Sequence, residues 1–200
     1  VVIDGTWATN SNPTNEIIFL NGLRQRRLFS LASSYCQQRL ATSNLTDRNR
    51  ILLIAELSRC YAERALHSEP TKRETDWELA TTVIDDWNHQ YEDDSRYLVA
   101  RVQQALVWLA RGEWSRQATE NNSIETRNWD ETRTALRLAI TQLETLATDV
   151  VQDLRQSHND PNRLSNQELR SLQTNIRFQL ARAYRNRALT YAPESADRIS

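Results

Sequence analysis

An eleven-residue segment that occurs twice constrains the fold of this chain more than any other feature of the sequence. The segments Glu56–Leu66 and Gln179–Leu189 are identical at six of eleven positions, and each is followed by a proline at the same distance, Pro70 and Pro193. The two copies lie 123 residues apart. Similarity at a fixed offset is typical of stacked helical arrays, because each unit buries its apolar face only against its neighbours. The repeat therefore predicts an all-α chain of packed helices.

Composition agrees with helices and argues against several functions. Only three glycines and four prolines interrupt 200 residues, and no segment alternates apolar and polar residues as a strand would. The 25 basic and 26 acidic residues give a net charge of -1, which argues against a nucleic acid partner. No apolar run reaches the roughly 18 residues of a transmembrane helix.

Apolar residues at spacings of three and four divide the chain into helices. Residues 1–14 are polar and predict an extended N-terminal arm. Residues 15–200 predict a helical repeat domain, with helix pairs over about 15–42, 46–91 and 95–158 and a half repeat over 165–192. Gly112 predicts an interruption in the third pair. In a capping box, the side chain of the residue before a helix binds the backbone amide three residues later, and the carboxylate of that later residue binds the first amide in return. Three predicted helix starts have this spacing: Thr71 with Glu74, Asn128 with Glu131, and Ser165 with Glu168.

The chain resembles the tetratricopeptide repeat family. The resemblance is carried by small and aromatic residues at family spacings in four places: Gly22-Leu23 with Arg27 to Ala32, Leu57-Ser58 with Tyr61, Ala80 and Ile84, Ala105 and Trp108 with Gly112-Glu113-Trp114, and Leu180-Ala181 with Tyr184. It implies a right-handed α-solenoid of antiparallel helix pairs that binds proteins or peptides. Degenerate arrays of this kind resemble bacterial scaffolds, exported or periplasmic as often as cytoplasmic. The chain contains no methionine, which slightly favours a processed, exported protein.

The resemblance also implies a binding groove on the concave surface. In the family this surface is lined by the residue after the small one and the two residues after the aromatic. Those positions are Arg59, Ala62 and Glu63 in the first copy, and Arg182, Arg185 and Asn186 in the second. Arginines there could bind an acidic peptide or a C-terminal carboxylate. The alternative is an ordinary solvated helix face.

These features favour a non-enzymatic protein-interaction scaffold, and the alternative is a structural subunit of a homo- or hetero-oligomeric assembly. Three glycines cannot form a phosphate-binding loop, and the histidines have no serine or cysteine at triad spacing. Asp85, His89 and Asp93 share a helical face and could hold a divalent ion. A helix end with acidic residues explains them better, so we predict neither a metal nor another cofactor.

Three expectations concern burial. Cys36 and Cys60 should lie in neighbouring helices as thiols. Four tryptophans should be mostly buried between helices: Trp77, Trp87, Trp108 and Trp129. The face of Leu180, Ala183 and Tyr184 should be less covered than that of Leu57 and Tyr61, because the sequence contains no helix after Pro193 to match the one after Pro70. Further residues of a longer chain or another subunit would then cover it.

Overall fold

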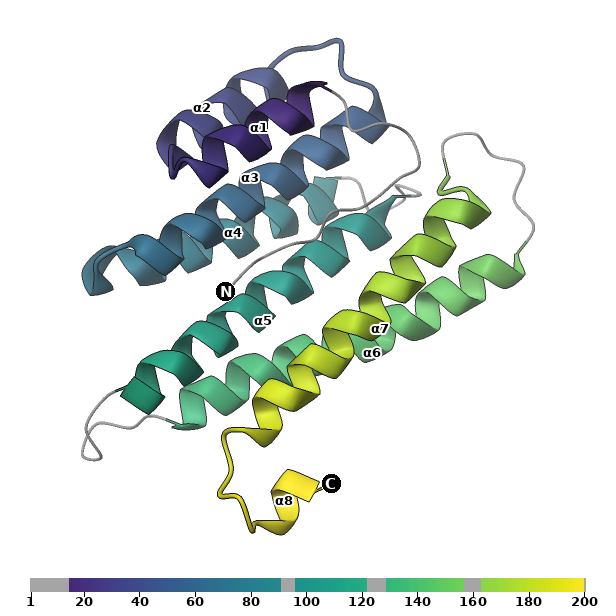
Figure 1. The fold of residues 1–200 in the computed structure, drawn as a ribbon. Coiled ribbons are helices and arrows are strands. Elements are labelled where there is room, and N and C mark those ends of the chain that lie inside the picture. Colours follow the sequence, from purple (N-terminus) through teal and green to yellow (C-terminus); the bar gives the residue numbers. More distant parts are fainter. Residues whose placement is uncertain (1–14, 91–95, 122–128, 157–162, 200) are drawn as a thin grey trace.

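The computed structural model describes residues 15–90, 96–121, 129–156 and 163–199, and these residues form helices without any strand (Figure 1). This confirms the all-α prediction for the described part of the chain. The helices are α1 (Asn15–Gln25), α2 (Phe29–Leu40), α3 (Asp47–His67), α4 (Pro70–Gln90), α5 (Tyr97–Asn121), α6 (Trp129–Arg155), α7 (Asn166–Ala188) and the single turn α8 (Ala196–Ile199).

The helices contact one another in an alternating pattern. Each of the first seven helices packs against the next one in the sequence. In addition, α1 contacts α3, α3 contacts α5, and α5 contacts α7. Figure 1 shows α5 between the group of α1 to α4 and the group of α6 and α7. The odd-numbered helices therefore form a continuous series, with α5 in contact with both groups.

Three apolar clusters make up the core, and α5 contributes to all of them. Val107 and Ala110 of α5 pack with apolar residues of the first four helices. Val99 and Ala100 of α5 pack with residues of α3 and α4. A separate row of α5 residues packs with α6 and α7. This row consists of Leu98, Val102, Ala105, Leu106 and Leu109. A helix that is apolar around most of its circumference must be enclosed on several sides. The sequence of α5 therefore requires neighbours on both of its sides.

Two predicted helix boundaries are confirmed by cap geometry. Thr46 caps α3, because its side chain accepts a hydrogen bond from the backbone N–H of Asn49 at 3.3 Å. Ser165 and Glu168 form the predicted capping box at the start of α7. Both caps satisfy amides that have no partner inside the helix.

Two other predictions about helix boundaries are wrong. α4 already begins at Pro70, so Thr71 lies inside the helix and does not cap it. Proline is favoured in the first helical position, because its missing N–H would have no partner there. α5 continues through Gly112 without a break. Asn128, the third predicted cap, lies outside the described residues.

The first two helices expose apolar side chains that their spacing placed inside. Arg27 adopts a left-handed backbone conformation with φ of 59° in the turn between α1 and α2. Leu20, Leu23, Ala32 and Cys36 of this pair are buried. Ile18, Phe19, Leu28 and Leu31 are exposed. A spacing of three and four between apolar residues predicts inward positions for Phe19, Leu28 and Leu31, and this prediction is wrong.

The expectations for cysteine are confirmed, and those for tryptophan hold to different degrees. Cys36 in α2 and Cys60 in α3 are buried thiols. Trp77 and Trp87 are buried, whereas Trp108 and Trp129 are half-buried. The N-terminal arm at residues 1–14 lies outside the described residues. None of the described helices combines the length and apolar character needed to cross a membrane.

The two glycines within helices predict opposite effects of alanine. A Cβ atom at Gly112 would lie 2.7 Å from Cγ and Cδ2 of the buried Leu136 in α6, whereas a Cβ atom at Gly22 would meet only Nη1 of Arg26 at 3.4 Å. Overpacking costs about 1–3 kcal/mol, and alanine gains up to about 1 kcal/mol in helix propensity. Gly112→Ala should lower the melting temperature by a few degrees, and Gly22→Ala should raise it slightly. Thermal unfolding followed by circular dichroism measures both, and a stabilised Gly112→Ala variant would contradict the close contact of α5 with α6.

The start of α7 predicts a pH-dependent stability. Burial tends to raise the pKa of Glu168, but hydrogen bonds from the N–H and Oγ of Ser165, together with the charges of Arg96 and Arg48, lower it below its ordinary value of 4.5. A lowered folded pKa contributes stability above the unfolded value, and this contribution disappears as the pH falls through the folded value. Glu168→Gln should therefore cost about 1 kcal/mol at pH 7 and almost nothing below the folded pKa.

The control for this experiment is Glu78→Gln, which changes an exposed carboxylate in the middle of α4. Urea unfolding at pH 7 and at a pH below the folded pKa of Glu168 should give nearly the same free energy of unfolding for this control and for the parent chain. A Glu168→Gln effect that is the same at both pH values would show that the charge of Glu168 contributes nothing.

Candidate interaction surface

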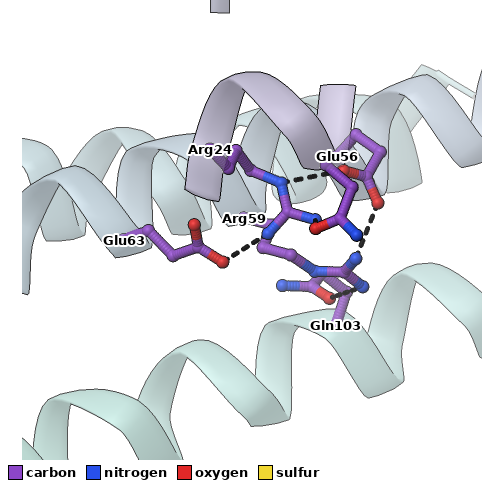
Figure 2. A network of polar contacts seen from close by, with 6 residues as sticks. Arg24, Glu56, Arg59, Glu63 and Gln103 are labelled. Carbon is purple, nitrogen blue, oxygen red and sulfur yellow. Dashed lines mark hydrogen bonds and ion pairs between the residues drawn. The ribbon is translucent and has the colours of Figure 1, made fainter. Parts of the chain in front are cut away.

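The first copy of the repeated segment contributes to a buried network of charged side chains (Figure 2). Arg24 of α1 pairs with Glu56 at 3.2 Å and with Glu63, both on α3. Arg59 of α3 donates to Glu56 at 2.6 Å and to Oε1 of Gln103 on α5 at 3.4 Å. The side chains of Arg24, Glu56 and Arg59 are all at least nine-tenths buried. The network links α1, α3 and α5.

Burial and charge act against each other in this network. Burial raises the pKa of Glu63, because a carboxylate loses hydration there, and the nearby guanidinium groups of Arg24 and Arg59 oppose the rise only in part. Burial tends to lower the pKa of Arg24, but the charges of Glu56 and Glu63 raise it overall. Each group therefore depends on its partners within the chain to stay charged.

The second copy makes a similar network on the other side of α5. Arg182 of α7 donates to both carboxylate oxygens of Glu113 on α5, with Nε at 2.5 Å from Oε1. Asn186 donates to the same Oε1 at 2.7 Å and accepts from Nε of Arg116 at 3.0 Å. Glu113 is 4% exposed. Arg59 and Arg182 occupy matching positions of the repeat, and each binds a buried polar side chain of α5.

Of the six predicted groove positions, Ala62 is fully buried, and the five polar residues differ in their surroundings. Arg59 is 4% exposed, Glu63 is half-buried, and both bind residues of this chain. Arg182 and Asn186 bind Glu113. Arg185 is exposed, and no ion pair of its guanidinium occurs among the described residues. In this conformation four of the five side chains connect helices, and Arg185 alone of the five is exposed.

An outward-facing surface of α7 has a covered counterpart in α3. We call it the α7 outer face, and it consists of Arg177, Phe178, Ala181, Tyr184 and Arg185, all of which are exposed. Their counterparts 123 residues earlier are all buried: Ile54, Ala55, Ser58, Tyr61 and Ala62. Phe178 is 65% exposed and Tyr184 is 43% exposed, against 7% for Tyr61.

This comparison confirms that Leu180 and Tyr184 are less covered than Leu57 and Tyr61. Leu57 is buried, whereas Leu180 is half-buried. Ala183, which we expected on the same face, is buried. Phe178 and Arg177 were not recognised from the sequence, although their counterparts in α3, Ala55 and Ile54, would have identified them.

A groove between α6 and α7 borders the α7 outer face. Its volume is about 630 Å3, and Arg155 and Arg177 contribute cationic groups to it. Its remaining lining residues are Ala147, Thr148, Val151, Gln152 and Gln173. Tyr184 donates a hydrogen bond from its hydroxyl to Glu144 of α6, and this bond raises the pKa of Tyr184. The exposed surface therefore combines aromatic groups with Arg155 and Arg177, for which no ion pair occurs among the described residues.

The residues considered for a metal do not form a site in the described structure. His89 Nδ1 lies 2.7 Å from the backbone oxygen of Asp85, and the Asp85 carboxylate accepts a hydrogen bond from Gln104 at 2.5 Å. Asp93 lies outside the described residues. No group of three or more histidine, cysteine, aspartate or glutamate side chains in the described part of the chain is arranged to hold a metal ion.

Comparison of the chain with protein-family models, with curated proteins and with solved structures finds no match. Any function assigned to the chain must therefore come from its own sequence and geometry.

The network around Glu113 predicts that Arg182 and Arg185 differ in their effect on stability. Arg182→Ala leaves a buried carboxylate with a single side-chain donor from Asn186, and removing one partner of a buried pair costs about 3–5 kcal/mol. Because Arg182 is partly exposed, we expect about 2–4 kcal/mol. Arg185 is an exposed residue of the same helix, so Arg185→Ala should change the stability by no more than about 0.5 kcal/mol.

Urea unfolding of both variants tests this difference. A double-mutant cycle of Arg182→Ala with Glu113→Ala should show a coupling of about 1–3 kcal/mol. Equal effects of the two arginine substitutions, or no coupling, would show that Arg182 does not depend on Glu113.

Proposed function

We propose that this chain is a non-enzymatic protein-interaction scaffold, a tetratricopeptide-like helical array that binds a protein or peptide partner. The alternating contacts of α1, α3, α5 and α7 support an array in which each helix pair packs against the next. The matching positions of Arg59 and Arg182 support a repeated unit, because both arginines bind α5. Such arrays offer extended surfaces to partners.

The observation that carries this proposal is the exposure of the α7 outer face. Apolar side chains that lie together on a surface mark interaction sites in soluble proteins. Phe178 and Tyr184 lie on either side of Ala181, whose counterpart Ser58 is fully buried beneath α4. A small residue between two aromatic rings allows another backbone to approach closely.

The alternative is a structural subunit whose copies pack end to end. The apolar side chains exposed on α1 and α2 could then meet the α7 outer face of a second copy. The charges oppose this contact. Arg26 and Arg27 are exposed in the segment 15–40, and Arg170, Arg177 and Arg185 are exposed on α7. The other arginines of these two surfaces that form ion pairs, Arg24, Arg39 and Arg182, are paired with carboxylates of this chain. Like charges on both surfaces repel each other, so a different partner is favoured.

A peptide display library screened against the whole chain tests the proposal. We expect selected peptides to bind the parent chain, to lose binding to Ala181→Arg, and to bind Leu138→Arg as before. Leu138 is also an exposed apolar residue, 40% exposed on α6, so it controls for the added charge and for general hydrophobic binding. Binders that do not distinguish Ala181→Arg from the parent would contradict an interaction site on α7.

The molar mass of the chain, measured by light scattering over a concentration series, separates the scaffold from the structural subunit. We expect a monomer in dilute solution. A multimer that persists on dilution and dissociates in Ala181→Arg would favour the subunit instead.

A further inference from the structure

We infer that the α7 outer face binds an acidic amphipathic helix, which lies across α7 as α4 lies across α3. This inference rests on the proposed interaction function and adds the chemistry of the partner. It follows from three observations: the way in which α4 covers α3, the side chains that differ between α3 and α7, and the absence of an ion pair of Arg177 or Arg185 among the described residues.

The contact of α4 with α3 provides a template within the same molecule. Ser58 Oγ donates to the backbone oxygen of Ala80 at 2.7 Å, which shows that the two helices approach closely at the small residue. Arg64 near the end of α3 pairs with Asp76 of α4 at 2.5 Å. Around these polar contacts, Trp77, Ala80, Ile84 and Trp87 of α4 are buried. α4 is also acidic, with five carboxylates against two cationic residues.

The second copy of the segment keeps the features that receive α4. Ala181 preserves a small side chain at the point of close approach, and Tyr184 and Leu180 repeat Tyr61 and Leu57. Arg187 repeats Arg64, the residue that pairs with Asp76. A helix in the corresponding position on α7 would therefore meet a small residue, a tyrosine ring and a terminal arginine at matching positions, although Ala181 lacks the hydroxyl with which Ser58 binds α4.

The positions that changed determine the chemistry of the partner. Arg177 and Arg185 stand where α3 has the buried Ile54 and Ala62. No ion pair of Arg177 or Arg185 occurs among the described residues. Covering these guanidinium groups with apolar side chains would leave buried charges without partners, which is strongly unfavourable. A covering helix must therefore carry carboxylates beside its apolar residues.

A second copy of this chain fits this surface less well than an acidic partner. The exposed apolar surface of α1 and α2 lies among arginines, including the exposed Arg26 and Arg27. The acidic helix of this chain, α4, already has its apolar face buried against α3. A separate acidic helix provides both the apolar contact and the opposite charge.

A synthetic peptide with the sequence of residues 69–90 is a defined probe, because it carries the apolar and acidic residues of α4. Fluorescence anisotropy of the labelled peptide with the whole chain should show saturable binding that weakens as salt is added. Arg177→Glu/Arg185→Glu should weaken this binding at least about tenfold, since two attractive charges become repulsive. Ala181→Arg should abolish it, because the added side chain fills the point of close approach.

Two control peptides separate the contributions of charge and apolar contact. Replacing the six carboxylate residues of the peptide by amides should remove the salt dependence and weaken binding to the parent chain. Trp77→Ala in the peptide should weaken binding without changing the salt dependence. All chain substitutions are at exposed positions, so their melting temperatures should remain near that of the parent.

The inference is overturned if the peptide does not bind, if it binds Ala181→Arg as well as the parent, or if the amide peptide binds better than the acidic one. Equal binding to Ala181→Arg would mean that the peptide displaces α4 from α3. The display library distinguishes a failure of the acidic-helix inference from a failure of the proposed interaction function. Library binders that depend on Ala181 but are neither acidic nor helical would preserve the interaction site and overturn only the acidic helix.

Discussion

The burial of α5 on two opposite sides is the constraint on which the rest of the structure depends. Val107 and Ala110 face the first four helices, whereas Leu106 and Leu109 face α6 and α7. Gly112 allows α6 to approach so closely that a side chain there would overlap Leu136. A helix with so much apolar surface cannot be stable alone in water. The two groups of helices therefore form one structure, because each covers a side of α5 that the other leaves bare.

The buried Arg59 and the half-buried Arg182 fix the positions of α3 and α7 along α5. Buried ion pairs often add little net stability, because the loss of hydration offsets the attraction between the charges. They nevertheless penalise wrong arrangements. A shift of α7 by one helical turn, about 5.4 Å, would separate Arg182 from Glu113 and leave a buried carboxylate without its main partner. On the other side of α5, Arg59 and Gln103 impose a similar restriction. Apolar contacts hold the helices together, and these polar pairs select their register.

The sequence predicted the helices well, because the apolar spacing of three and four persists along most of the chain. It also identified the repeated segment and the difference in cover between Tyr61 and Tyr184. It did not predict that Arg59 would be buried, since an arginine on a helix is usually solvated and its partner Gln103 lies on a helix distant in sequence. Gly112 was misinterpreted as a break for a similar reason: its role is set by Leu136, which belongs to another helix. Tertiary contacts of this kind leave no local signal.

The α7 outer face combines charged and apolar side chains. Arg177 and Arg185 stand at the positions of the buried Ile54 and Ala62, and these charges favour solubility. Phe178 is 65% exposed and stands where α3 has the buried Ala55. Solubility alone does not explain a phenylalanine at this exposed position. Burying a phenylalanine side chain is worth about 1.5–3 kcal/mol compared with leaving it in water. Arginines beside an exposed ring suit a partner that offers carboxylates and apolar groups together, because such a partner would recover this free energy while neutralising the charges.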